Sequence, residues 1–386
     1  MLRWPRNRVL LLLVVLLAAA LFTLPFVSFA PNRLVSGQPV MLSRLLRGAG
    51  WLIPLIVPLL LLLAWQPLNR PTLILTLGLS EILLTLLVAL GGHAAETLAG
   101  QGSALSRTSF GSGLWAAGAL CLLIAADSVL RLTHNGAWRL LLNAQVWLPL
   151  ILLLAGGQLD QLALLKEYAT RQDVFDQALS RHLLLLIATL VPALLLGVPL
   201  GLFCYRRARW QATIFSVLNI IQTVPSVALF GLLIAPLAGL AAHFPWLARL
   251  GVSGIGLAPA LIALVLYALL PLVRSVVAGL QQVPSGVRET AAGMGMSRGQ
   301  IFWQVEIPLA LPVLLRGLRV VTVQTVGMAV IAALIGAGGF GAIIFQGLLS
   351  SALELVLLGV IPVIALAVLV DALFNIAISL LERKTL

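Results

Sequence analysis

Long apolar runs recur along almost the whole chain, and short polar segments separate them. Each run approaches the roughly 20 residues that an α-helix needs to cross a bilayer. The runs do not alternate between apolar and polar positions, so helices are predicted rather than barrel strands. We predict an all-α polytopic membrane protein with about ten transmembrane helices, at residues 9–29, 50–65, 71–91, 113–133, 138–156, 183–204, 213–237, 256–277, 314–335 and 355–380.

One stretch, residues 158–181, interrupts the apolar pattern with charged side chains such as Lys166 and Glu167. Its apolar positions form a weak pattern for a short surface helix. We predict an extracytoplasmic linker between a five-helix extension at 1–157 and a five-helix core at 182–381. No internal repeat relates the two halves.

The composition excludes an ordinary soluble domain. Hydrophobic residues make up 61% of the chain and charged residues 9%, against roughly 25% charged residues in soluble domains. The net charge of +12 is spread over loops, so membrane lipid is the expected contact and nucleic acid is not. Cys121 and Cys204 lie far apart in apolar runs, and the four histidines are scattered. The sequence therefore predicts neither a disulfide framework nor a metal site.

The basic residues predict the orientation in the membrane. The first apolar run, 9–26, is longer than the roughly 7–15 residues of a signal-peptide core, so we expect an uncleaved first helix. With the N-terminus inside, 16 of the 24 Lys and Arg residues fall in inner loops and 8 in outer loops. Positive charge favours the cytoplasmic side. Both termini are therefore predicted to be cytoplasmic.

Residues 288–308 (RETAAGMGMSRGQIFWQVEIP) place small and charged residues between two apolar runs. A flat Ala/Gly surface flanked by charges predicts a docking site for another protein. The segment resembles the loop of ABC-importer permeases with the pattern Glu-Ala-Ala, three residues, Gly, nine residues, Ile-x-Leu-Pro. Thr290 for Ala, Val305 for Ile and Ile307 for Leu are conservative departures from it. The residues that match in position are Glu289, Thr290, Ala291, Gly295, Val305, Ile307 and Pro308.

Four further segments extend the resemblance over about half of the chain. They are 197–201 (GVPLG), 221–226 (IQTVPS), 267–274 (YALLPLVR) and 333–341 (ALIGAGGFG). In this order they resemble the permeases of osmoprotectant ABC importers, which carry glycine betaine, choline or carnitine. The long N-terminal extension is similar to a subset of them, the permeases of a low-affinity glycine betaine uptake system. The resemblance implies a MetI-like five-helix core of the type-1 importers.

The resemblance also implies a function and partners. The chain would be the permease subunit of an ATP-driven importer in the bacterial inner membrane, forming the path for a compatible solute such as glycine betaine. Its partners would be a pair of ABC ATPase subunits, a second permease (the same or a homologous chain) and an extracytoplasmic solute-binding protein. The alternatives are an ABC permease for another small polar substrate, such as an amino acid or methionine, and a secondary transporter working alone, which needs no docking loop.

The chain lacks the phosphate-binding pattern Gly-x-x-x-x-Gly-Lys. We therefore expect no catalytic residue and no cofactor in this chain, with ATP and Mg²⁺ bound by the partner ATPase.

The resemblance assigns the docking to a cytoplasmic coupling loop at 279–312. Small residues there permit close approach, and charge-assisted hydrogen bonds from Glu289 and Arg298 can fix the orientation of the partner. An ordinary cytoplasmic helix held by its own neighbours is the alternative. The predicted coupling residues are Glu289, Thr290, Ala291, Ala292, Gly293, Gly295, Arg298, Val305, Ile307 and Pro308.

Four polar residues in the span 213–237 follow the spacing i, i+3, i+4 and i+7, which places them on one face of a helix. Pro225 would bend that face. A hydrated translocation path would satisfy these polar groups; hydrogen bonds between helices are the alternative. The residues are Asn219, Gln222, Thr223 and Ser226.

A glycine-rich segment follows the span 314–335 on the predicted outer side. It holds too many glycines for a stable helix. We expect a flexible outer gate or re-entrant turn, or else a plain connecting turn. The candidate gate residues are Gly336, Gly338, Gly339 and Gly341.

Acidic residues within or at the ends of spans are candidates for function, because charges are costly in the membrane. Asp127 precedes Arg131 by four residues and can pair with it. Glu354 suits the start of a helix. Glu81 has no obvious partner.

For the fourth acid, Asp371, depth in the membrane predicts pairing with Arg319 first and Arg316 second.

Overall fold

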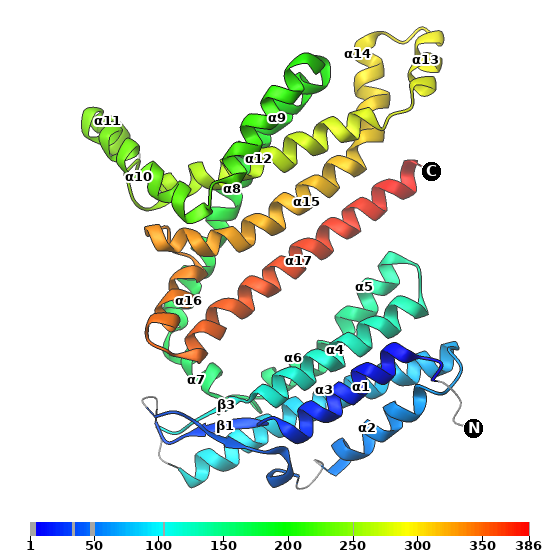
Figure 1. Cartoon of the computed structure of the whole chain (residues 1–386), viewed down its shortest axis with the longest axis vertical. Coiled ribbons are helices and arrows are strands. Elements are labelled where there is room, and N and C mark those ends of the chain that lie inside the picture. The colour runs from blue at the N-terminus through cyan, green and yellow to red at the C-terminus, as the bar shows by residue number, and fades with distance from the viewer. Residues whose placement is uncertain (1–4, 33–34, 47–50, 103–104, 250, 386) are drawn as a thin grey trace. The chain divides into compact units, whose positions relative to one another are not determined.

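The computed structural model describes residues 5–32, 35–46, 51–102, 105–249 and 251–385. The chain divides into two compact units, residues 1–170 and 171–386, which are described separately here (Figure 1). The boundary between them lies inside the predicted linker 158–181. That linker is helical for most of its length, because one short helix ends at Thr170 and a long one begins at Gln172.

The first unit is a helical bundle with a small sheet at one end. Helices α3 and α4 are long enough to cross a membrane, and α5 and α6 form one such stretch together. The elements are α1 (Arg8–Thr23), β1 (Val27–Ala30), β2 (Gln38–Val40), η1 (Leu42–Arg44), α2 (Leu52–Leu63), α3 (Arg70–Gln101), β3 (Arg107–Phe110), α4 (Ser112–Leu132), α5 (Gly136–Gln145), α6 (Leu148–Ala155) and α7 (Ala163–Thr170).

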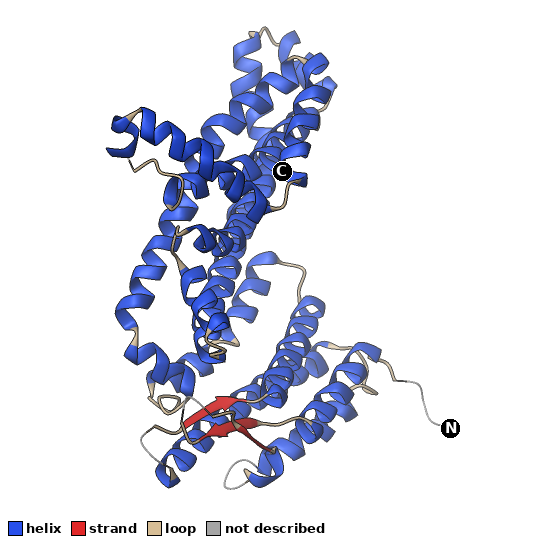
Figure 2. Ribbon diagram, turned by 60° about the vertical axis from the view of Figure 1, so that its left-hand side comes forward, coloured by secondary structure: helices blue, strands red, loops and turns tan. Residues whose placement is uncertain are grey.

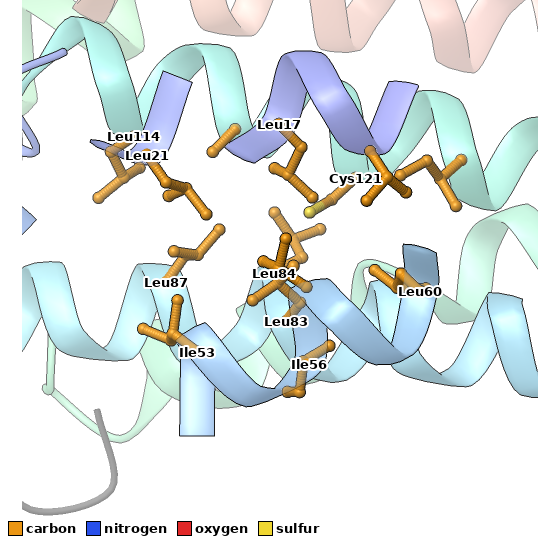
Figure 3. Packing of buried hydrophobic residues seen from close by; sticks show 14 of the residues in the cluster. Leu17, Leu21, Ile53, Ile56, Leu60, Leu83, Leu84, Leu87, Leu114 and Cys121 are labelled. Carbon is orange, nitrogen blue, oxygen red and sulfur yellow. The ribbon is translucent and has the colours of Figure 1, made fainter. Parts of the chain in front are cut away.

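Leucine and isoleucine side chains from α1, α2, α3 and α4 form the core of this unit (Figure 3). Leu17 on α1, Leu60 on α2 and Leu83 on α3 are fully buried. The Cys121 thiol on α4 belongs to the same core. Within a bilayer such packing relies on close contact between side chains, because lipid is as apolar as leucine.

The antiparallel sheet β2-β1-β3 is an element that the apolar pattern did not predict (Figure 2). Helix α1 ends earlier than the predicted span because Pro25 follows Leu24, and a residue before proline avoids the helical conformation. The chain then runs extended, and Val27 pairs with Val40 on one side and with Phe110 on the other. Strands this short carry too few alternating positions to stand out in a sequence.

Charged residues fasten α7 to the sheet. The Arg107 guanidinium pairs with the buried Glu167 carboxylate at 3.4 Å. The Lys166 ammonium donates to the Ser106 carbonyl at 3.3 Å. Desolvation and then the charge of Arg107 lower the pKa of Lys166. Part of the predicted linker is therefore held against the first unit by ionic contacts.

The second unit consists of long helices and several short ones. Helix α12 is its central element, and it packs against both α8 and α15. The elements are α8 (Gln172–Arg206), α9 (Ala208–Thr223), α10 (Ser226–His243), α11 (Pro245–Arg249), α12 (Leu257–Gln281), α13 (Ser285–Gly293), α14 (Arg298–Ile301), the π-helix η3 (Phe302–Glu306), α15 (Ile307–Ile331), the 3₁₀ helix η4 (Ala332–Ile335), α16 (Phe340–Leu349) and α17 (Leu353–Thr385).

The all-α polytopic fold is confirmed. Among the described residues, eight helical stretches are long and apolar enough to cross a membrane. Three further apolar helices are shorter: α1, α2 and α16. Helix α16 lies inside what the sequence suggested was a loop, because an apolar helix of ten residues is too short to be recognised as a span.

The predicted continuous span 213–237 is wrong. The helix breaks at Val224 and Pro225, where α9 ends and α10 begins. Val224 is extended, with a ψ of 126°, as expected for the residue before a proline. Proline also removes one backbone donor from the helical ladder. The sequence reasoning expected a bend at Pro225, and the chain makes a complete break instead.

Candidate functional site

The loop between α12 and α15 folds as two short helices and a π-helical turn. Helix α13 ends in a Schellman motif, in which the Met296 amide donates to the Ala291 carbonyl at 3.2 Å. The Gly295 amide donates to the Ala292 carbonyl at 3.0 Å. Gly295 has a φ of 83°, a left-handed conformation that glycine adopts without strain. The glycine of the docking pattern is therefore needed to end α13.

Helix α14 begins with a capping box. The Ser297 hydroxyl accepts from the Gln300 amide at 3.4 Å, and the Gln300 side chain accepts from the Ser297 amide at 2.8 Å. These two bonds satisfy backbone donors that a helix start leaves free. With the Schellman motif, they give this loop a defined shape in place of a flexible connection.

The loop presents a small-residue surface. Glu289, Ala292 and Gly293 are exposed, and Met294 is 71% exposed. A side chain added at Gly293 would meet no atom of this chain within 4 Å. Ala291 is buried against its own chain, so this predicted coupling residue does not belong to the exposed surface.

An open cleft of about 870 Å³ lies beside this surface. Arg298, Gly299 and the 69% exposed Trp303 line it together with Glu289 and Ala292. The predicted coupling residues Thr290 and Pro308 are exposed, and Val305 and Ile307 are half-buried. The loop thus offers both a flat apolar face and a charged, aromatic cleft to a partner.

Charged residues that also line the cleft connect the loop to the membrane helices. The Arg288 Nε lies 2.8 Å from the Glu306 Oε1 atom. The Arg288 Nη2 donates to the Leu280 carbonyl at 2.7 Å. The Tyr205 hydroxyl donates to Glu306 at 3.5 Å. Sequence reasoning did not single out this cluster, because its three side chains, from Tyr205, Arg288 and Glu306, lie 18 to 101 residues apart.

The predicted polar stripe is split by the break at Pro225. Asn219 accepts from Arg274 Nη2 at 3.0 Å, and Gln222 donates to the Tyr267 carbonyl at 2.8 Å. Thr223 donates to a carbonyl of its own helix. Ser226 starts α10, so a single helix face through all four residues is not formed. Two of them connect α9 to α12, and a role in the translocation path stays a prediction.

The glycine-rich segment forms a turn of left-handed glycines that contacts α8. Gly336, Gly338 and Gly339 have φ values of 82°, 82° and 76°. The Arg181 Nε donates to the Ala337 carbonyl at 2.9 Å, and fully buried His182 lies against Gly339.

Gly341 differs from the other three glycines, because it lies inside α16 and packs on the Val330 carbonyl with no room for a side chain. A gate here would therefore involve the whole of α16, and that role stays a prediction.

The two membrane acids with a predicted partner, Asp127 and Asp371, are each found paired with it. Asp127 pairs with Arg131 Nε at 2.8 Å. Glu81, which had no predicted partner, accepts from Gln145 Nε2 at 3.0 Å. Glu354 lies in the first turn of α17, as predicted.

The last acid, Asp371 on α17, accepts from Arg319 Nε on α15 at 2.5 Å. This is the first-choice partner. Asn375 completes the cluster, because it accepts from Arg319 at 2.6 Å and donates to Asp371 at 3.0 Å. The second candidate, Arg316 on α15, pairs with Glu382 near the end of α17. Two ionic contacts therefore join α15 to α17.

Comparison with known proteins covers both units. Residues 193–386 match the family described as binding-protein-dependent transport system inner membrane component. Residues 6–165 match the N-terminal domain of ABC transporter permease YehY.

Curated relatives match about half of this chain. The osmoprotectant import permease protein OsmW of Salmonella typhimurium is 39% identical over 200 residues, which is 50% of this chain and 86% of the relative. The choline transport system permease protein OpuBB of Bacillus subtilis is 34% identical over 203 residues, 53% of this chain and 84% of the relative. The glycine betaine/carnitine/choline permease protein OpuCB of the same organism is also 34% identical.

Among solved structures, the MetNI methionine ABC transporter in an inward-facing conformation has a TM-score of 0.48 at 21% identity, covering 54% of this chain and 97% of that one.

The long apolar helices and the structured loop between them define a membrane transport subunit. The chain belongs to the family of binding-protein-dependent transport system inner membrane components. It is the membrane permease of an ABC importer and not an enzyme; a separate subunit hydrolyses ATP. Members of such systems work with an ATPase and a binding protein, in the inner membrane.

Proposed function

We propose that this permease imports a compatible solute such as glycine betaine. The observation that carries the proposal is the similarity of its second unit to permeases whose names specify osmoprotectants, choline, carnitine and glycine betaine, at 30–39% identity. An intramembrane path for such a zwitterion needs polar groups in a bilayer that otherwise excludes them. Asn219, Gln222, Thr223 and Ser226 are the residues proposed to supply them.

The complete transporter would hold two permease cores, either identical or homologous, around a central path. Two ATPases that bind ATP and Mg²⁺ would lie on the cytoplasmic side, and a solute-binding protein on the other side. The loop 279–312 would receive the ATPase through Glu289, Ala292, Gly293 and Met294. The exposed small-residue surface on α13 supports this assignment.

Reconstitution into proteoliposomes with the partner ATPase and binding protein tests the substrate. Labelled glycine betaine, carnitine, choline, proline and methionine would be offered in turn. We expect ATP-dependent uptake of glycine betaine that an excess of unlabelled betaine removes, and little uptake of methionine. Uptake of methionine or another amino acid in preference to quaternary ammonium compounds would contradict the proposed substrate.

The orientation of the chain gives a second prediction. Single cysteines would replace the exposed residues Gln101, Asp173 and Ser297. The native Cys121 and Cys204 are buried, so we expect neither thiol to react with the labelling reagent. In intact cells we expect an impermeant maleimide to label positions 101 and 173, and position 297 only after permeabilisation. The reverse pattern would overturn the assignment of both termini to the cytoplasm, which the basic residues favour.

A further inference from the structure

The cluster around Arg288 lies at a junction of four elements of the second unit. Arg288 belongs to α13, which carries the surface proposed to receive the ATPase. Its guanidinium reaches the Leu280 carbonyl in the last turn of α12. It also pairs with Glu306 at the end of the π-helix η3, and it lies 6.0 Å from the centre of the Tyr205 ring on α8.

The bond to Leu280 completes the end of α12. The last carbonyls of a helix have no partner within the helix. The Leu280 carbonyl accepts from the Val283 amide at 3.4 Å, and Arg288 adds a second, shorter bond that also interacts favourably with the helix dipole. The Arg288 side chain therefore joins α13 to the end of α12, although the helix itself ends at Gln281.

Glu306 is the last residue of the π-helix η3, directly before α15. Pro308 lies at the start of α15 and has no amide hydrogen, so the α-helical ladder is already interrupted there. The chain forms a wider turn, in which the Ile307 amide donates to the Phe302 carbonyl five residues earlier. A π-turn accommodates an extra residue and changes the direction of the side chains before it. The proline of the docking pattern therefore lies directly beside the π-turn that carries Glu306.

Burial makes the pair sensitive to loss of either partner. The Glu306 side chain is 12% exposed and that of Arg288 is 31% exposed. Removal of one member leaves the other charge in a poorly hydrated position, which is far more costly than the loss of an exposed pair. The next residue, Glu289, is exposed and remains available to a partner.

We propose that Arg288 and Glu306 are positioning residues that make the coupling loop move as one body with α8, α12 and α15. The ATPase surface on α13 moves during the cycle, and the Arg288–Glu306 contact transmits that movement to the start of α15. This inference rests on the proposed function, because it presumes that the ATPase docks on α13. It predicts that the pair acts on the efficiency of coupling and not on assembly.

The test uses the complete reconstituted complex, with uptake and ATP hydrolysis measured on the same vesicles. For Arg288→Ala and Glu306→Ala, we expect the ATPase to co-purify as with the wild type and to hydrolyse ATP. The solute imported per ATP should fall at least about tenfold, as expected when a buried charge loses its partner. The reciprocal exchange, Arg288→Glu with Glu306→Arg, restores the ion pair but not the bond to the Leu280 carbonyl, so it should recover part of the ratio.

Arg316→Ala is the matched control, because it removes the exposed ion pair between Arg316 on α15 and Glu382 on α17. Exposed pairs contribute little, so its uptake-to-hydrolysis ratio should stay at the wild-type value. An unchanged ratio in the single variants would overturn the inference, as would loss of the ATPase from the complex or failure of the exchange to restore coupling. Absence of ATP-driven uptake by the wild type would instead contradict the proposed function itself.

Discussion

A tryptophan in place of Gly293 is expected to abolish transport while leaving the permease folded. Gly293 is the last residue of α13 and is exposed, and an added Cβ there meets no atom within 4 Å apart from its chain neighbours and its own helix backbone. The indole is therefore expected to extend from the surface of α13 toward a docked partner. Overpacking a tight contact costs about 1–3 kcal/mol, which is enough to weaken docking by roughly 5-fold to more than 100-fold.

The measurement compares uptake and ATPase co-purification with those of two controls. Gly293→Ala adds one methyl group and should retain most of the activity. Gly136→Trp places the same side chain on another exposed glycine with open space around it, in the first unit. It should transport normally. Wild-type uptake by Gly293→Trp, with the ATPase still bound, would show that α13 does not receive the ATPase.

This choice of position follows from the structure. The pattern alone made Gly295 the natural site for such a substitution, because it is the glycine of the docking motif. Its positive φ means that any side chain there also strains the backbone and loosens the end of α13. A defect at Gly295 would therefore not separate docking from folding, whereas a defect at Gly293 does.

Replacement of Asp371 by asparagine is expected to destabilise the second unit. The change leaves Arg319 without a carboxylate partner inside the membrane, where a lone charge costs about 2.5–3.5 kcal/mol on insertion scales. The two side chains are 34% and 38% exposed, so partial access to water should reduce the loss to about 1–3 kcal/mol. Thermal unfolding in detergent should show a lower midpoint.

Removal of the arginine as well should recover part of that loss, because the unpaired charge disappears. Arg319→Met in the Asp371→Asn background tests this as a double-mutant cycle. Asp127→Asn is the control, since Asp127 pairs within one helix and Arg131 lies in its last turn. That change should cost a few tenths of a kcal/mol. An Asp371→Asn variant as stable as the wild type would show that the pair does not hold α15 to α17.

The contacts that could be predicted from the sequence were those set by depth or by local spacing. Asp371 and Arg319 lie at similar depths on two helices, and an arginine can close the remaining difference. Asp127 and Arg131 are four residues apart on one helix. In both cases an unpaired charge in the membrane is costly, so few pairings are favourable. The positions of the residues along the sequence are therefore enough to predict the pairs.

Other features depended on local backbone geometry that an apolar pattern does not contain. The Arg288–Glu306 pair lies at a π-turn directly before Pro308, and an apolar pattern does not predict such a turn. The span 213–237 was predicted through Pro225 as a bent helix, whereas the helix stops there. Helix α16 was missed because a ten-residue apolar helix is too short for a span, and the β1–β3 sheet because its strands are short.

We propose that this permease is driven by an ATPase that acts through the loop 279–312. Uptake of labelled glycine betaine into proteoliposomes that contain the permease and binding protein, with and without the partner ATPase and internal ATP, tests whether it is. We predict uptake only when both are present, and none with a proton or sodium gradient alone. Gradient-driven uptake by the permease without the ATPase would show instead that it works as a secondary transporter.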